Sequence, residues 1–156
     1  MVEKFEFQAA DRPLLRALQQ DGRISNQDLA ERANMSTSAC WRRVKALEEG
    51  GVIARYTAII DPAAVGLSFH AMVHVGLSRH QAGHVEAFIG AVMTRPEVLD
   101  CFATTGDADY HLRVLCKDLN AYNAFLEHFL FALEGVSTVR TNLILRQLKH
   151  ETRVEV

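Results

Sequence analysis

Apolar residues in the first fifty positions recur at helical spacing and predict three short helices. The first covers residues 10–20, and the second covers residues 26–33 after an N-cap at Ser25. The third begins after a second cap at Ser36 and runs to about Glu49, where a glycine pair ends it. Two capped helices that are separated by a short turn are typical of a helix-turn-helix.

The third predicted helix has an apolar side and a polar side. Cys40, Val44 and Leu47 lie at i, i+4 and i+7, so they should pack inward. On the other side, short hydroxyl side chains at the helix N-terminus are followed by basic residues, a combination that suits phosphates and base edges. The candidate DNA-contacting residues are Ser36, Thr37, Ser38, Trp41, Arg42, Arg43 and Lys45.

Two alternatives stay open for this segment. Arg43 lies beside the apolar side of the helix, so its side chain could instead serve packing or an ion pair. The three helices together could also form a generic helical corner that binds no DNA, because the same spacing stabilises both kinds of structure.

Strands and helices alternate in the second half of the chain. A short strand is expected over residues 52–60, before a break at Asp61-Pro62. Every second residue of 69–77 is then apolar, which is typical of a strand with one buried face. The elements expected next are a helix at 84–94, strands at 98–105 and 110–116, a helix capped by Asp118, and a last strand at 137–148.

This β-α-β-β-α-β order is the ferredoxin-like arrangement, in which two helices cover one face of a four-stranded antiparallel sheet. The side of the first helix that faces the sheet should carry Val85, Phe88, Ile89 and Val92. The other sheet face has no helix to cover it, so we expect it to meet another subunit. Phe125 and Phe131 are further apolar residues that would suit such an interface.

The predicted fold class is therefore α+β. We expect an N-terminal helix-turn-helix (winged-helix-like) domain over residues 1–53 and a linker strand and hinge over residues 54–66. A C-terminal ferredoxin-like βαββαβ domain should occupy residues 67–156, which is an ordinary size for one small domain.

Composition narrows the class of protein. The 156 residues are 49% hydrophobic and 23% charged, which excludes a disordered or low-complexity chain. No long apolar window is present, and the start of the chain lacks the layout of a signal peptide, so we expect a cytoplasmic protein with no membrane partner. Three widely spaced cysteines argue against a disulfide framework or a structural zinc site.

The formal net charge of −2 hides a gradient along the chain. Residues 1–60 carry a net charge of +1, whereas residues 61–156 carry −3. Residues 32–45 contain four basic side chains and no acidic one. A local basic stripe on a nearly neutral chain is compatible with a DNA-binding module that is joined to a more acidic domain.

At several places the sequence resembles the Lrp/AsnC family of bacterial and archaeal transcription regulators. The segments that carry the resemblance are DGRIS at 21–25, CWRRVKALE at 40–48, GVIARYTA at 51–58, DP at 61–62, GL at 66–67, PEVLDC at 96–101 and TGDADY at 105–110. They occur in the family's order and spacing, so the resemblance covers nearly the whole chain.

The resemblance implies a sequence-specific DNA-binding regulator that responds to a small effector, typically an amino acid, with no further cofactor. It also implies a homodimer that assembles into a tetramer or octamer and binds double-stranded DNA at an imperfect palindromic operator. Carried over position by position, the effector site comprises Thr104, Thr105, Gly106, Asp107, Asp109 and Tyr110. The two aspartates have an equally plain explanation as residues that stabilise the turn.

Other functions have less support in the sequence. His70 and His74 share a predicted strand face, and His80 and His84 lie near a helix start, but neither pair has the three or four converging ligands of a zinc site. No nucleophile elbow, phosphate loop or zinc-protease motif is present, so we expect no enzyme. An amino-acid-binding assembly protein without specific DNA binding, and a metal- or redox-responsive regulator, remain the alternatives.

Overall fold

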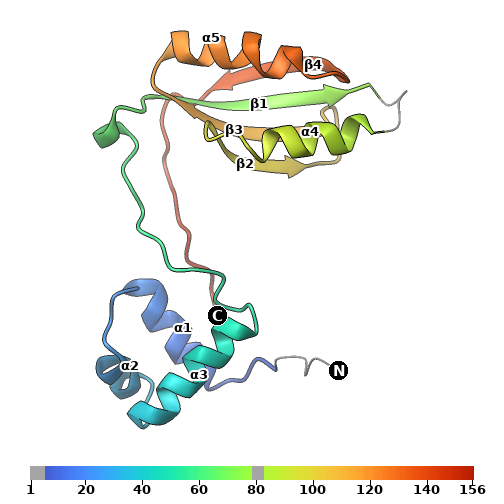
Figure 1. Ribbon diagram of the computed structural model, residues 1–156. Helices are drawn as coiled ribbons and strands as arrows, with labels where there is room; N and C mark the ends of the chain where they lie inside the picture. Colours follow the sequence, from blue (N-terminus) through green and yellow to red (C-terminus); the bar gives the residue numbers. More distant parts are fainter. Residues whose placement is uncertain (1–5, 79–82) are drawn as a thin grey trace. The chain divides into compact units, whose positions relative to one another are not determined.

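The computed structural model describes residues 6–78 and 83–156 (Figure 1). The chain forms two compact units. The first contains the residues up to Ile59 together with His150–Val156, and the second contains Ile60–Lys149. The last residues of the chain thus pack with the N-terminal unit. The domain division expected from the sequence had placed them in the C-terminal domain.

The first unit is built from three helices, as the sequence predicts: α1 (Asp11–Gln20), α2 (Asn26–Arg32) and α3 (Thr37–Glu49). Both expected caps are present, because the Ser25 hydroxyl accepts a hydrogen bond from the Asp28 N–H and the Ser36 hydroxyl accepts one from the Ala39 N–H. These caps satisfy N–H groups that the first turn of a helix leaves unpaired, and they fix the short turn between α2 and α3.

The core of this unit forms where the apolar sides of the three helices meet. Leu14 of α1, Leu29 of α2, and Cys40 and Leu47 of α3 are buried together. Val44 packs against them from a half-buried position, so the predicted inward side of α3 is confirmed.

One buried charge also lies at this junction. The Asp11 carboxylate is fully buried at the start of α1 and forms an ion pair with the Arg43 guanidinium of α3. The Gln8 N–H donates to the same carboxylate at 2.7 Å, and Arg43 also donates to the Glu6 carbonyl at 3.0 Å. The hydrogen bond from Arg43 lowers the pKa of Asp11 below its ordinary value. The pair thereby joins α1 to the helix that carries the candidate DNA contacts.

The prediction of a strand over residues 52–60 is wrong. Residues 52–60 form bends and irregular structure, and the described residues of the chain provide no neighbouring strand for them. A strand requires a hydrogen-bonded partner, so an apolar and β-branched sequence is not sufficient by itself. Ile59 and Ile60 are accordingly exposed.

The second unit has the predicted βαββαβ order. Its elements are β1 (Phe69–Leu77), α4 (His84–Val92), β2 (Val98–Ala103), β3 (Tyr110–Cys116), α5 (Leu119–His128) and β4 (Val136–Leu143), with short 3₁₀ turns at Ala63–Val65 and Leu130–Ala132. The strands pair antiparallel in the order β2-β3-β1-β4 (Figure 1). The last strand ends at Leu143 rather than 148.

Both helices cover the same face of this sheet. Ala71, Val73 and Val75 of β1 are fully buried beneath Phe88 of α4 and Phe125 of α5. The burial of Phe125 corrects its expected place at a subunit interface, because the ring fills the core instead; Phe131 is exposed. Fewer of the apolar residues of α4 are buried than the sequence predicts.

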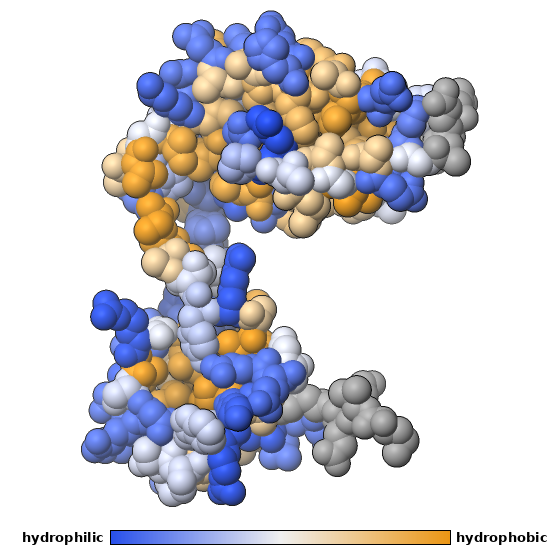
Figure 2. Space-filling view, viewed as in Figure 1, coloured by the Kyte–Doolittle hydropathy of each residue, from blue (hydrophilic) through white to orange (hydrophobic). Residues whose placement is uncertain are grey.

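Phe88 and Val92 of α4 are buried, whereas Val85 and Ile89 are 43% and 41% exposed. Much of the visible surface of this unit is hydrophobic (Figure 2). Among the described residues, no helix is both long enough and apolar enough to cross a membrane.

We expect the Asp11→Ala variant to destabilise the first unit by roughly 3 kcal/mol, because it leaves the Arg43 guanidinium without its buried partner. The folded-state pKa of Asp11 is lowered, so the contribution is fully present above the ordinary pKa of 3.8 and disappears as pH falls through the lowered value. Denaturant unfolding can be followed by the fluorescence of Trp41, the single tryptophan.

The matched control is Glu49→Ala, which removes an exposed ion pair with Lys45 on α3 and should cost less than about 1 kcal/mol. Equal unfolding midpoints for the two variants at pH 7 would contradict a structural role for the buried pair.

Candidate functional site

The outer side of α3 presents the hydroxyl and basic groups that the sequence singles out. Thr37, Ser38, Trp41, Arg42 and Lys45 are all exposed, with Trp41 at 56%. Because Cys40 and Leu47 anchor the opposite side of the helix in the core, these side chains project from a rigid support. The helix N-terminus adds unpaired backbone N–H groups, which favour anionic partners such as phosphate.

The basic residues on this side differ in how far they are engaged. Arg42 makes no hydrogen bond or ion pair with any residue that the structure describes. The Lys45 ammonium lies 5.4 Å from the centre of the Trp41 ring and 3.6 Å from the Glu49 carboxylate, both exposed contacts that DNA can replace at little cost. Arg42 is therefore the most available cation on α3.

Two of the predicted DNA-contacting residues also have roles within the fold. The Ser36 hydroxyl caps α3, and it also lies 3.4 Å from the Ser38 hydroxyl. The Arg43 side chain forms an ion pair with the buried Asp11 carboxylate. This is the second of the two roles that the sequence left open for Arg43. A guanidinium that is held there cannot reach a phosphate without leaving a buried carboxylate unpaired, and we therefore remove Arg43 from the candidate contacts.

In the second unit, the turn between β2 and β3 is held by its own hydrogen bonds. The Thr104 N–H donates to the Asp109 carbonyl at 3.0 Å. The Thr104 hydroxyl lies 3.1 Å from the Ala108 carbonyl oxygen and 2.8 Å from His111 Nδ1. Gly106 has φ of +125°, a conformation that a side chain would disfavour, so glycine is required at the tip.

The two aspartates of this turn lie in different environments. Asp109 Oδ2 accepts a hydrogen bond from the Leu77 N–H at 2.8 Å, and the Asp109 N–H donates to the Val75 carbonyl at 3.0 Å. Asp109 thus ties the turn to the end of β1. Asp107 is exposed and makes no hydrogen bond or ion pair with a described residue.

Tyr110 also supports the turn from inside. Its ring packs against Phe88 of α4 with 4.9 Å between the ring centroids. The tyrosine therefore faces the helix-covered side of the sheet, away from the residues of the opposite face.

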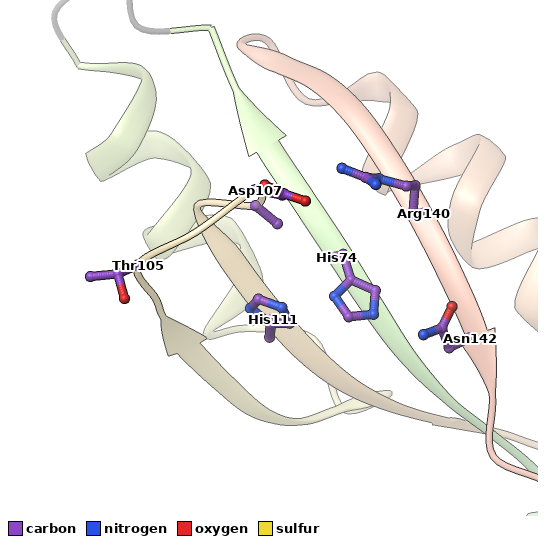
Figure 3. A pocket seen from close by; sticks show the side chains of 7 residues that line it. His74, Thr105, Asp107, His111, Arg140 and Asn142 are labelled. Carbon is purple, nitrogen blue, oxygen red and sulfur yellow. The ribbon is translucent and has the colours of Figure 1, made fainter.

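A cavity of about 380 Å³ lies beside this turn on the sheet face that the helices do not cover (Figure 3). Of the residues predicted for the effector site, Thr105 and Asp107 line this cavity. Five further lining residues were not predicted as site residues: His74, Ala108, His111, Arg140 and Asn142. The strand face that His74 shares with His70 is a sequence signal for His74, and the nearness of His111 to the turn is a signal for that residue.

Strand register explains why these residues meet. His74 of β1 lies directly opposite His111 of β3 on one side and Arg140 of β4 on the other. The two imidazole rings meet edge to face with centroids 4.5 Å apart. Nε2 of His74 is buried and has no hydrogen-bond partner among the described residues. Burial, His111 and Arg140 together lower the pKa of His74, so this ring is neutral at pH 7.

The cavity carries one charge of each sign at its rim. The Asp107 carboxylate and the Arg140 guanidinium point toward one another across the region above His74 (Figure 3). Arg140, like Asp107, makes no hydrogen bond or ion pair with a described residue. Such an arrangement can hold a molecule that has an anionic and a cationic group close together.

The described part of the chain does not arrange its side chains as a metal site or a reactive thiol would require. No three His, Cys, Asp or Glu side chains there converge as metal ligands. Burial raises the pKa values of Cys101 and Cys116, which lie against the core of the sheet, so neither is a reactive thiolate. His80 lies outside the described residues.

Each of the two units is similar to a known protein family. Residues 8–54 match a winged helix-turn-helix DNA-binding model, and residues 70–154 match the Lrp/AsnC ligand binding domain. A leucine-responsive regulatory protein of Rhizobium meliloti is 38% identical over the whole of both chains. The Escherichia coli K12 DNA-binding transcriptional activator DecR is 34% identical, with 94% of this chain and 96% of DecR covered.

A solved structure is also closely similar. A Neisseria meningitidis transcriptional regulator, crystallised as a complex with L-Met, superposes with a TM-score of 0.90 at 35% identity, and 96% of each chain is covered.

Paired substitutions separate the two aspartates of the turn. We expect Asp109→Ala to lower the stability of the second unit by about 2 kcal/mol, because the Leu77 N–H loses its acceptor. Asp107→Ala should change stability by less than about 0.5 kcal/mol, since it removes an exposed carboxylate. Differential scanning calorimetry distinguishes the two, and equal losses would show that the turn does not divide these roles.

Proposed function

This chain belongs to the Lrp/AsnC family of DNA-binding transcriptional regulators, and from that premise we propose how it uses its two units. It binds operator DNA through the outer side of α3, and an amino acid bound beside the β2–β3 turn alters that binding. The observation that carries the proposal is Arg42, which is exposed and has no partner among the described residues, on a helix whose opposite side is anchored in the core.

At the DNA, we assign contacts to five residues. Arg42 and Lys45 reach phosphates or base edges, while Thr37, Ser38 and Trp41 position the helix or read bases from its exposed N-terminal turns. In a homodimer, two such helices enter successive major grooves about 34 Å apart, so the operator is an imperfect palindrome.

For the ligand, the charges at the cavity fit an α-amino acid. Arg140 can bind its carboxylate through two parallel hydrogen bonds, and Asp107 can accept from its ammonium group. Thr105 and the backbone N–H groups around Gly106 offer further contacts. The L-Met complex of the Neisseria regulator supports an amino acid as the ligand class. Thr104, Asp109 and Tyr110 act by holding the turn in shape.

Assembly belongs to the same proposal. The sheet face that carries the cavity has no helix over it, and a second subunit there would complete a homodimer. Exposed apolar residues at α4 and its C-terminal end and near α5, such as Ile89, Met93 and Phe131, suit further contacts that build a tetramer or octamer. A ligand that binds one assembly more tightly than another shifts the population toward it and so changes operator affinity.

We expect Arg42→Ala to weaken operator binding and to reduce the slope of log affinity against log salt by about one, because one phosphate contact is lost. The measurement is fluorescence anisotropy with a duplex that the wild-type protein selects from a random-sequence pool, repeated at several salt concentrations.

The matched control is Arg12→Ala, which removes the same charge from an exposed position on α1 and should leave the slope unchanged. If Arg42→Ala and wild type show identical affinities and slopes, Arg42 does not contact DNA. Normal binding by Ser36→Ala at reduced thermal stability would agree with its role as a cap.

We expect Arg140→Ala and Asp107→Ala each to weaken amino-acid binding roughly tenfold or more, since each removes a charge-assisted hydrogen bond. Isothermal titration calorimetry with individual L-amino acids, beginning with L-methionine, gives the affinities. Lys117→Ala, an exposed cation of the same unit, is the control and should bind like wild type. Unchanged binding by both rim variants would place the ligand elsewhere.

A further inference from the structure

The C-terminal segment His150–Val156 docks on helix α1 (Figure 1). The Gln19 side-chain amide pairs with the backbone of Val154 twice, donating to its carbonyl at 3.0 Å and accepting from its N–H at 2.7 Å. Arg16 donates to the Val156 carbonyl at 2.6 Å. The Val156 side chain is half-buried against the core of the three helices.

The same stretch of chain begins at the ligand cavity. Arg140 and Asn142, which line the cavity, belong to β4. The last hydrogen bond to the sheet is donated by the Ile144 N–H to the His70 carbonyl at 2.8 Å. Residues 145–149 are exposed and have no regular secondary structure, and the docked segment follows directly. One wall of the cavity is therefore covalently continuous with a contact on α1.

Helix α1 in turn holds the DNA-binding helix. Asp11 at its N-terminus is ion-paired with Arg43 of α3, and Leu14 and Leu15 lie in the core that also buries Leu47 of α3. The segment 150–156 thus docks on the element against which α3 is fixed. By contrast, the linker at 54–66 joins the two units through residues that are mostly exposed.

We propose that residues 145–156 are a second tether through which ligand binding in the cavity acts on the DNA-binding unit. A single linker leaves a joined unit free to reorient, whereas a second connection that ends in a docked segment removes much of that freedom. A ligand that draws Arg140 toward Asp107 biases β4, and the tether carries this bias to α1. This inference rests on the proposed function, since it assigns a route to the ligand response.

The decisive variant lengthens the tether without touching its docking residues. Insertion of Gly-Ser-Gly-Ser after Gln147 keeps the Val154 and Val156 contacts but slackens the connection. A second variant, Gln19→Ala, removes both hydrogen bonds to Val154 while the tether keeps its length. Gln20→Ala, the adjacent exposed residue of α1, is the matched control.

The experiment measures the affinity of each full-length protein for the selected duplex, with and without a mixture of the common L-amino acids. Calorimetry with the same mixture records ligand binding, and thermal unfolding confirms that each variant is folded. For wild type and Gln20→Ala we expect the mixture to change DNA affinity about fivefold or more. For the insertion this ratio should fall to about one with ligand binding retained, and Gln19→Ala should reduce the ratio.

Each other result overturns the tether. A full response in the insertion variant shows that the linker at 54–66 or the assembly carries the signal, while the proposed function stands. If the insertion variant loses ligand binding, Gln19→Ala, which keeps the length of the tether, decides the question: an unchanged response in Gln19→Ala overturns the tether. A wild-type protein that binds the mixture with no change in DNA affinity removes both the tether and the ligand response, and DNA binding is then judged from Arg42→Ala alone.

Discussion

The alternation of side chains along β1 is the constraint on which the second unit depends. Because neighbouring residues of a strand point to opposite faces, the positions that bury Ala71, Val73 and Val75 beneath the helices also place His74 on the open face. As a central strand, β1 then brings the open-face residues of β3 and β4 beside His74. Core and cavity are thus two outcomes of one periodicity, and a shift in register would destroy both.

The first unit follows the equivalent rule for a helix. The side of α3 that buries Cys40 and Leu47 determines which residues face outward, and two serine caps determine where that helix begins. The Asp11–Arg43 pair adds a polar constraint at the same junction, so one basic residue of the CWRRVK segment faces inward while its neighbour Arg42 stays available. The two adjacent arginines therefore lie in different environments.

Sequence reasoning succeeded where the information is local. Helix periods, caps and strand alternation predicted the helices and the βαββαβ order. Two of the residues assigned by resemblance, Thr105 and Asp107, line the cavity. It failed where partners are distant in the chain. His111 and Arg140 join His74 only through strand register, and Asp11 meets Arg43 across 32 residues. Residues 52–60 have strand-like composition, but pairing depends on a neighbour that the sequence does not reveal.

The division of labour within the β2–β3 turn has an evolutionary consequence. Asp109 secures the backbone of the turn to β1, whereas Asp107, two residues away, touches nothing that the fold requires among the described residues. If the effector binds beside this turn as proposed, mutations at the exposed positions of the turn change recognition without destabilising the hairpin. A duplicated gene could acquire a new ligand by drift at these few positions, because the scaffold that must survive each intermediate is maintained by other residues.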